Sequence, residues 1–360
     1  MLELENVSKQ VGASMHIRDV SLVLERGSLN VLLGPTLSGK TTLMRLMAGL
    51  DRPSAGAVRM DGRDVTGVSV RKRDVAMVYQ QFINYPALTV YENIASPMRI
   101  ARVERGTLDR KVREAADLLK LTPYLERTPL NLSGGQQQRT AIARALVKGA
   151  ELVLLDEPLA NLDYKLREEL RVELPRLFAE SGAIFVYATT EPHEALLLGG
   201  RTATLHEGRI TQFGETIDVH DSPVDLVTAQ TFADPPLNTA RVVKKGSELH
   251  FGGHVLGDAA ADVADGDYTL AFRPHHVALA PSARHTVSVP ATVGTSEITG
   301  SETYLHARAD GGDDWVALTH GVHRVANGAA VTLHLDPARY YLFDQGGTLV
   351  RAPRAAAENR

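Results

Sequence analysis

The chain has 360 residues, a formal net charge of −4 and no cysteine. Because this length exceeds what one hydrophobic core usually serves, we expect two domains. The absence of cysteine excludes disulfides, cysteine-ligated zinc, iron–sulfur clusters and a cysteine nucleophile. The near-neutral charge offers no basic field for nucleic acid, so no nucleic-acid partner is expected. Without a long apolar run or a signal-peptide pattern, we expect a chain that is soluble by itself.

The first part of the chain alternates strand-like and helix-like segments. Apolar residues alternate with polar ones over 2–7 and 17–24, which predicts two strands. The short apolar run 29–33 predicts a buried strand, and the spacing of apolar residues over 41–50 predicts a helix. Residues 88–130 have a mainly helical pattern.

The same alternation continues along the chain. A helix is predicted after 133–135, ending at about Lys148, and the apolar runs 152–155 and 183–189 predict two more buried strands. Strands that alternate with helices indicate an α/β domain with a parallel sheet. We place this domain at residues 1–235.

A second domain is predicted after the Asp-Pro-Pro break at 234–236. Beyond it, short strand-like pieces are separated by glycine, aspartate and proline, which indicates a smaller all-β, antiparallel domain over 236–360. The pieces are 268–272, 287–293, 304–309, 330–335 and 340–343.

The segment Gly34–Thr41 reads GPTLSGKT and fits the pattern G-x-x-x-x-G-K-[ST] between a predicted strand and a predicted helix. Backbone N–H groups there cradle phosphates, Lys40 supplies a positive charge, and the hydroxyl of Thr41 suits Mg²⁺. The alternative is a chance glycine-rich turn, which the flanking elements argue against. The predicted nucleotide-binding residues are Gly34, Pro35, Thr36, Leu37, Ser38, Gly39, Lys40, Thr41 and Thr42.

Two carboxylates follow the apolar run 152–155. Asp156, at the end of a buried strand, can hold the Mg²⁺ shell, and Glu157 can polarise the water that attacks a phosphate. Four apolar residues before Asp-Glu are a weak signal alone. The signal gains weight because a phosphate-binding loop precedes it in the chain.

Between these motifs, residues 132–139 read LSGGQQQR. Ser133, Gly134 and Gly135 at the start of a helix form a second cluster of N–H donors for an anion. One chain with one phosphate-binding loop has no obvious internal use for it, so we infer that it serves a nucleotide on another subunit. The alternative is an ordinary N-capped helix after a flexible turn, which accounts for Ser133 alone.

The combination of these three motifs resembles the ATP-binding subunits of ABC transporters, over nearly the whole chain. The resemblance implies that Gln80 contacts Mg²⁺ and the membrane subunit, and that residues 160–163, ending at Asp163, communicate across an ATPase dimer. It also implies that Gln136 belongs to the second nucleotide contact and that 88–150 is a helical subdomain.

The implied ligands are therefore ATP and Mg²⁺. Thr41, Gln80 and Asp156 are the implied metal ligands. Glu157 and Lys40 are the implied catalytic residues.

The second half of the chain carries a related resemblance. Phe272–His276, Glu297–Thr303 and Tyr341–Asp344 resemble stretches of ATP-binding subunits that serve importers of sugars and polyols. They imply the OB-like regulatory domain of the maltose/glycerol-phosphate subfamily. The triplet Thr36–Ser38 is similar to the ATP-binding subunits of bacterial glycerol importers, which work as pairs of non-identical ATPases.

Three features depart from the family pattern. Thr190 occupies the position of a family histidine in the catalytic set, and it cannot carry a positive charge. His193 either substitutes for that histidine or is a solvated residue at a helix start. Leu37 replaces a usual glycine, and 11–16 lack an aromatic residue for adenine, offering only His16. All three affect the nucleotide site of this chain.

Two further candidates have ordinary interpretations. If their segment is a strand, the adjacent His275 and His276 point to opposite faces, which disfavours metal binding. The single tryptophan, Trp315, is expected to pack within the β-domain rather than hold a ligand.

The resulting hypothesis is an ATP-hydrolysing subunit of an importer for a carbohydrate or polyol, with glycerol the preferred substrate. It predicts two membrane permeases, a second and non-identical ATPase, and indirectly a solute-binding protein as partners, at the cytoplasmic face of the cell membrane. The chain would hydrolyse ATP slowly and lend 133–136 to its partner's site. The alternatives are an ABC-type switch outside transport and a silent regulatory subunit, which Lys40 and Glu157 argue against.

Overall fold

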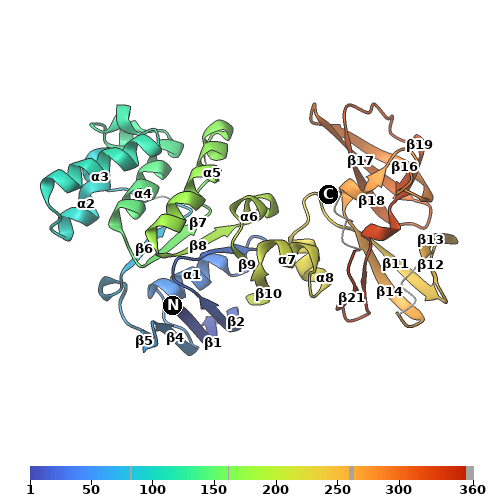
Figure 1. Cartoon of the computed structure of the whole chain (residues 1–360), viewed down its shortest axis with the longest axis horizontal. Coiled ribbons are helices and arrows are strands. Elements are labelled where there is room, and N and C mark those ends of the chain that lie inside the picture. Colours follow the sequence, from blue (N-terminus) through green and yellow to red (C-terminus); the bar gives the residue numbers. More distant parts are fainter. Residues whose placement is uncertain (82, 161, 259–262, 354–360) are drawn as a thin grey trace. The chain divides into compact units, whose positions relative to one another are not determined.

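The computed structural model describes residues 1–81, 83–160, 162–258 and 263–353. Its contacts divide the chain into two units, Met1–Thr216 and Ile217–Arg360, whose elements are labelled in Figure 1. The sequence predicts the boundary at 235. The division falls earlier because the residues just before 235 belong to the core of the second unit, where Ala229 clusters with Tyr341 and Phe343.

The first unit contains two sheets. The smaller one is antiparallel, in the order β2-β1-β4-β5. Its strands are β1 (Leu2–Val11), β2 (Ser14–Leu24), β4 (Ala55–Met60) and β5 (Arg63–Asp64). The larger one has the order β10-β9-β3-β8-β7-β6. Its strands are β3 (Leu29–Leu33), β6 (Val75–Val78), β7 (Leu152–Asp156), β8 (Ile184–Thr189), β9 (Arg201–His206) and β10 (Arg209–Glu215).

The larger sheet is parallel except for β10, which pairs antiparallel with β9. Every residue of β7 and β8 is buried, as expected for strands covered on both faces. Helix α1 (Lys40–Ala48) lies between the two sheets, since it contacts β2 of one and β6, β7 and β8 of the other. It ends at Gly49, whose φ of 73° is a left-handed C-cap that glycine adopts without steric cost.

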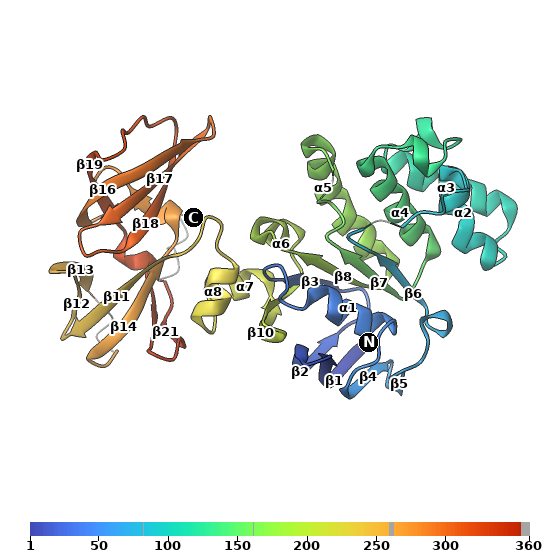
Figure 2. The ribbon, with the colours of Figure 1, turned by 180° about the vertical axis from the view of Figure 1, so that it is seen from behind.

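Three helices form the predicted helical subdomain, α2 (Val90–Ile100), α3 (Arg105–Leu118) and α4 (Gly134–Lys148). Helix α2 contacts both α3 and α4, and both views of the ribbon show the three grouped at one end of this unit (Figures 1 and 2). Short 3₁₀ turns occur at Val70–Lys72, Thr122–Tyr124 and Pro129–Asn131. Helices α5 (Tyr164–Ser181) and α6 (Pro192–Leu198) complete the unit.

The order of the parallel strands decides where the functional segments meet. Strands β3, β8 and β7 are neighbours in the sheet and run in the same direction. The segments that follow them begin at Gly34, Thr190 and Glu157. They therefore leave the same edge of the sheet, where open α/β sheets bind their ligands.

The second unit is an antiparallel β-domain preceded by α7 (Thr216–Asp221) and α8 (Leu226–Thr231). One sheet contains β11 (Asn238–Lys245), β12 (Glu248–Phe251), β13 (His254–Asp258), β14 (Gly266–Phe272), β20 (Tyr341–Phe343) and β21 (Leu349–Arg351). The other contains β15 (Val277–Ala278), β16 (Val287–Ile298), β17 (Glu302–Ala309), β18 (Asp314–His320) and β19 (Ala330–Leu335). Two 3₁₀ turns lie at Pro274–His276 and Pro337–Arg339.

Both sheets of the second unit share one core around the only tryptophan. Trp315 is 1% exposed, its ring lies 5.2 Å from that of Phe251 and 5.0 Å from that of Phe272, and its indole N–H donates to the carbonyl of Thr239. The expectation that Trp315 packs within the β-domain is confirmed.

His275 and His276 do not lie in a strand, so the argument from opposite strand faces does not apply to them. The two residues lie in the 3₁₀ turn that begins at Pro274, and their ring centroids are 4.2 Å apart. Proline has a fixed φ and no N–H to give to a sheet, so it favours a turn over a strand at this point. Among the described residues, no group of three or more histidine, cysteine or acidic side chains is arranged to hold a metal.

The second unit is expected to lose stability in mild acid through His276. Burial, aided by the charges of His275 and Arg339, lowers the pKa of His276 to about 3. The unfolded imidazole has a pKa of about 6.5, so below that pH only the unfolded chain gains the proton. We expect a loss of roughly 2 kcal/mol in the free energy of unfolding between pH 7 and pH 5 from this group. Urea unfolding followed by Trp315 fluorescence measures it, and His276→Phe should show a smaller loss. An equal loss in both proteins contradicts the assignment.

None of the helices in the described part of the chain is long and apolar enough to cross a membrane.

Candidate nucleotide-binding site

The predicted phosphate-binding loop joins β3 to α1. Gly34 donates its N–H to the carbonyl of Thr189 on β8, and Ser38 donates its N–H back to the carbonyl of Pro35. Gly39 has a φ of 109°, which glycine adopts without penalty, and its Cβ substituent would approach the Ile17 side chain within 2.9 Å. The hydroxyl of Ser38 is buried, and no described residue forms a hydrogen bond with it. The loop is thus tightly folded, and the Ser38 hydroxyl remains available to bind a polar ligand.

Lys40 is 5% exposed and points back into this loop. Its Nζ donates to the carbonyl oxygens of Gly34 (2.7 Å) and Pro35 (3.0 Å). Burial lowers the pKa of Lys40, and the charges of Glu157 and Asp156 oppose that shift. An ammonium held by two neutral carbonyls is readily drawn to a phosphate, which offers it charged oxygens.

Asp156 and Thr41 form a pair of oxygen donors. The hydroxyl of Thr41 donates to Oδ2 of Asp156 at 2.8 Å, and Asp156 is 2% exposed. Burial raises the pKa of Asp156. A buried carboxylate with only a hydroxyl partner gains from a cation, and hard oxygen donors are what Mg²⁺ prefers, so these residues fit the implied metal.

Glu157 opens the loop that follows β7. Its N–H donates to the carbonyl of Ala188 on β8, and its φ of 46° is uncommon for a residue with a side chain. Gln80 donates its amide to Oε2 of Glu157 at 2.9 Å, and Gln138 of α4 donates to the Glu157 carbonyl at 3.3 Å. Burial raises the pKa of Glu157. The carboxylate is therefore oriented by its neighbours and partly withdrawn from water.

Lys40, Thr41, Gln80 and Glu157 line one cleft of about 700 Å³, whereas Asp156 lies behind Thr41 and does not line it. The predicted residues that line it are Thr36, Leu37, Gly39, Lys40, Thr41, Thr42, Gln80 and Glu157. His16, the only flat ring the sequence offers for adenine, also lines it. Sequence reasoning did not find Met15, Arg18, Glu207 and Gly208 as lining residues.

Gly208 illustrates why sequence motifs do not predict these additional lining residues. Its N–H donates to the carbonyl of Ser38 and its carbonyl accepts from the N–H of Arg18, so it ties the phosphate loop to β2. A Cβ atom there would lie 2.5 Å from the carbonyl oxygen of His16, and the φ is 79°. The glycine is required by a close approach of distant segments, and no local pattern signals that.

Leu37 keeps the loop conformation at a steric cost. Its φ is 68° and its side chain is 96% exposed, so no burial compensates the left-handed backbone. We expect Leu37→Gly to unfold with about 1 kcal/mol more free energy than Leu37→Ala, which retains the strained φ. Chemical unfolding of the first unit measures the difference. Equal stability of the two variants contradicts the stated cost.

The LSGGQ segment lies elsewhere. Ser133 caps α4, with its hydroxyl accepting from the N–H of Gln136 and its own N–H donating to the Gln136 side chain. Among the described residues that line the cleft, none belongs to 133–136. The structure thus shows Ser133 in the ordinary capping role, while the carbonyl of Gly135 accepts a hydrogen bond from Nε of Arg139 at 3.3 Å.

Thr190 and Asp163 follow strands that end beside the cleft, but neither residue lines it. Thr190 is exposed and follows β8 directly, while the hydroxyl of the preceding Thr189 donates to the buried Glu194 at 2.7 Å. Asp163 caps α5 by accepting the N–H of Leu166. The predicted segment 160–163 includes Asn161, which lies outside the described residues.

Comparison with known proteins agrees with this arrangement. A family model described as "ABC transporter" matches residues 17–160, and one described as "TOBE domain" matches residues 270–343. The alpha-glucoside transport ATP-binding protein of Rhizobium meliloti is 35% identical over 98% of this chain and 99% of its own. The sn-glycerol-3-phosphate import ATP-binding protein of Ruegeria pomeroyi is 35% identical over 95% and 97%. The trehalose/maltose import ATP-binding protein of Thermococcus litoralis is 35% identical over 96% and 97%.

Solved structures support the fold of the first unit. The dimeric structure of a bacterial ABC transporter cassette is 29% identical, with a TM-score of 0.56, and covers 60% of this chain and 99% of its own. A dimeric post-hydrolysis state of a cassette bound to ADP and Pi has a TM-score of 0.55 over the same shares. With its phosphate loop, carboxylate pair, LSGGQ segment and TOBE domain, the chain belongs to the ATP-binding proteins of the ABC transporter family.

Proposed function

We propose that the chain is the ATP-hydrolysing subunit of an importer for a carbohydrate or polyol, with glycerol the preferred substrate. One observation supports the hydrolytic part of the proposal: Lys40, Thr41 and Glu157 line a single cleft, and Thr41 is hydrogen-bonded to Asp156. The names of the relatives carry the transport part, because they include import proteins for alpha-glucosides, sn-glycerol-3-phosphate and trehalose or maltose.

In this proposal, the residues of the cleft have different roles in ATP hydrolysis. Lys40 leaves its two carbonyl partners and binds the β- and γ-phosphates, where its charge offsets the charge that develops in the transition state. Glu157, held by Gln80, accepts a hydrogen bond from the attacking water and aims it in line with the γ-phosphate. Thr41, Asp156 and Gln80 would hold Mg²⁺, which would act as a Lewis acid and neutralise charge on the phosphate oxygens.

We propose further that the working unit is a pair of non-identical ATPases. Residues 133–136 lie outside the cleft of their own chain, which supports a role at the site of another subunit. Thr190, Leu37 and the missing adenine aromatic weaken only this chain's own site. The chain would bind two membrane permeases at the cytoplasmic face of the membrane, and a solute-binding protein would join indirectly.

Co-purification from cells that produce the chain with its candidate partners tests the proposal. We expect recovery with polytopic membrane proteins and with a second ATPase that carries the histidine. We also expect low ATP turnover for the isolated chain and higher turnover for the mixture. Recovery with RNA or DNA instead of membrane proteins would contradict transport, and full turnover by the isolated chain would contradict the asymmetric pair.

A further inference from the structure

The loop after β8 is held by a buried arginine of α5, Arg171. The side chain of Arg171 is 7% exposed and forms ion pairs with Glu191 at 3.0 Å and Glu194 at 3.1 Å. Glu194 also accepts hydrogen bonds from the hydroxyls of Thr189 (2.7 Å) and Tyr187 (3.1 Å). These short contacts fix the residues on both sides of Thr190 to a rigid base.

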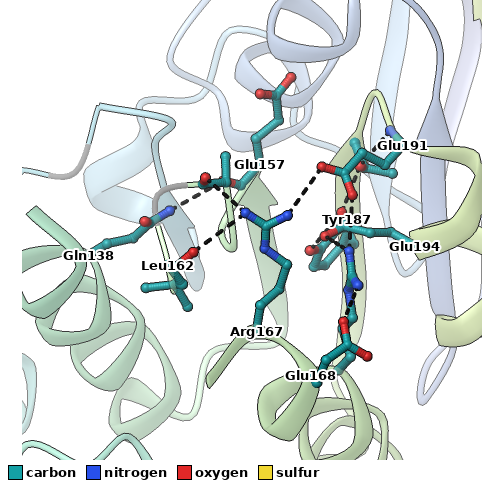
Figure 3. A network of polar contacts seen from close by, with 11 residues as sticks. Gln138, Glu157, Leu162, Arg167, Glu168, Tyr187, Glu191 and Glu194 are labelled. Atoms are coloured by element: carbon teal, nitrogen blue, oxygen red, sulfur yellow. Dashed lines mark hydrogen bonds and ion pairs between the residues drawn. The ribbon is translucent and has the colours of Figure 1, made fainter. Parts of the chain in front are cut away.

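Arg167, one helical turn earlier, reaches a second loop. Its guanidinium donates to the carbonyl oxygens of Ala160 (3.3 Å) and Leu162 (3.5 Å), in the loop that follows β7. On its other side the guanidinium lies 3.6 Å from the carboxylate of Glu191, as Figure 3 shows. Its Nε is buried and has no hydrogen-bond partner among the residues that the structure describes. Arg167 therefore bridges two loops through contacts longer than those of Arg171, and longer contacts are weaker.

The two bridged loops carry the residues that matter for hydrolysis. Glu157 opens the loop after β7, and Thr190 lies in the loop after β8. The strands are paired neighbours, and the N–H of Glu157 donates to the carbonyl of Ala188 at 3.0 Å. A change in the gap between the loops therefore changes the position of the Glu157 carboxylate relative to residue 190.

We propose that Arg167 is a positioning residue that holds the Glu157 loop and the Thr190 loop in one arrangement, so that ATP hydrolysis occurs only when both loops are in place. Arg171 holds the Thr190 loop against α5, and Arg167 forms the weaker connection between the Thr190 loop and the Glu157 loop. The inference rests on the proposed hydrolysis of ATP at this site.

Hydrogen–deuterium exchange of the full chain without nucleotide tests the link directly. Arg167→Gln weakens the connection of the segment after β7 to Glu191, which Arg171 holds in place, and should raise deuterium uptake over residues 158–163 about threefold at early times. The matched control is Arg176→Gln on the same helix, whose partner Glu173 is 3.5 Å away and whose side chain is 70% exposed. Its uptake over 158–163 should equal that of the wild type. Unchanged uptake in Arg167→Gln overturns the proposal.

Steady-state kinetics with Mg²⁺ and ATP test whether the Arg167 connection between the two loops affects hydrolysis. We expect kcat to fall about tenfold in Arg167→Gln and in Glu191→Gln, with the Kd for ATP within twofold of wild type. Combining the two substitutions should cost less than the product of the separate losses, because both remove the Arg167–Glu191 contact, although Glu191→Gln also removes the ion pair with Arg171. Arg167→Lys should recover part of the loss. A multiplicative loss in the double variant, or unchanged kcat in the presence of raised exchange, overturns the positioning role.

The exchange and kinetic measurements distinguish a failure of this inference from a failure of the proposed function on which it rests. A wild-type chain that binds ATP without any turnover, alone and with its partner, contradicts the proposed function. The exchange measurement needs no turnover and still decides whether Arg167 joins the two loops.

Discussion

Thr190→His is expected to raise ATP turnover at this chain's own site by on the order of 10²-fold. Residue 190 leaves β8 directly beside the phosphate loop, because Thr189 pairs with Leu33 at the end of β3. An imidazole is longer than a threonine side chain and carries a positive charge when protonated. It can therefore reach and neutralise a γ-phosphate that threonine leaves uncompensated in the transition state.

Single-turnover hydrolysis by the chain, alone and with its partner, measures this gain. Thr190→Gln is the matched control, since it adds length and hydrogen-bonding groups without charge, and we expect it to recover little of the rate. His193→Ala should leave the wild-type rate unchanged if that residue is a solvated helix-start residue. If Thr190→His turns over no faster than wild type, the missing histidine does not limit this site.

Glu157→Gln is expected to lower turnover by on the order of 10²–10³-fold while ATP binding persists. The amide cannot accept a proton from water or orient it with a full charge. Because the group is partly buried and accepts a hydrogen bond from Gln80, a neutral isostere fits the same space. Binding should persist because Lys40 and the phosphate loop are untouched.

Rapid-mix hydrolysis and equilibrium ATP binding by the variant separate the two effects. Glu207→Gln is the matched control, because Glu207 also lines the cleft and the change removes the same charge. We expect that control to alter turnover by less than a few-fold. Comparable losses in both variants would mean that Glu157 acts through the general charge of the cleft rather than on the water.

The second unit shows where sequence patterns fail. The strand β11 is absent from the predicted pieces because its inward positions include polar residues. Lys244 is 3% exposed and bonds to Asp265 at 2.9 Å, and Asn238 exchanges hydrogen bonds with the backbone of Val316. Buried polar side chains that are satisfied by distant partners break the apolar alternation on which strand prediction depends.

In the candidate site, too, some residues can be predicted from the sequence and others cannot. The phosphate loop, the Asp156–Glu157 pair and the segment 132–139 could be recognised because each is a contiguous string whose chemistry depends on local backbone geometry. The roles of Arg18 and Gly208 could not be recognised, since their positions depend on how β2 and the turn between β9 and β10 meet the loop.

The sequence by itself determined the near-neutral, cysteine-free composition, the α/β unit followed by a β-domain, and the motifs for phosphate and metal. The tertiary structure alone decided which motifs share a cleft, which lie outside it, and which arginine bridges the two loops beside Glu157. The physical reason is range: turn geometry and charge spacing act within a few residues, whereas strand order and buried ion pairs join residues that are far apart in the chain.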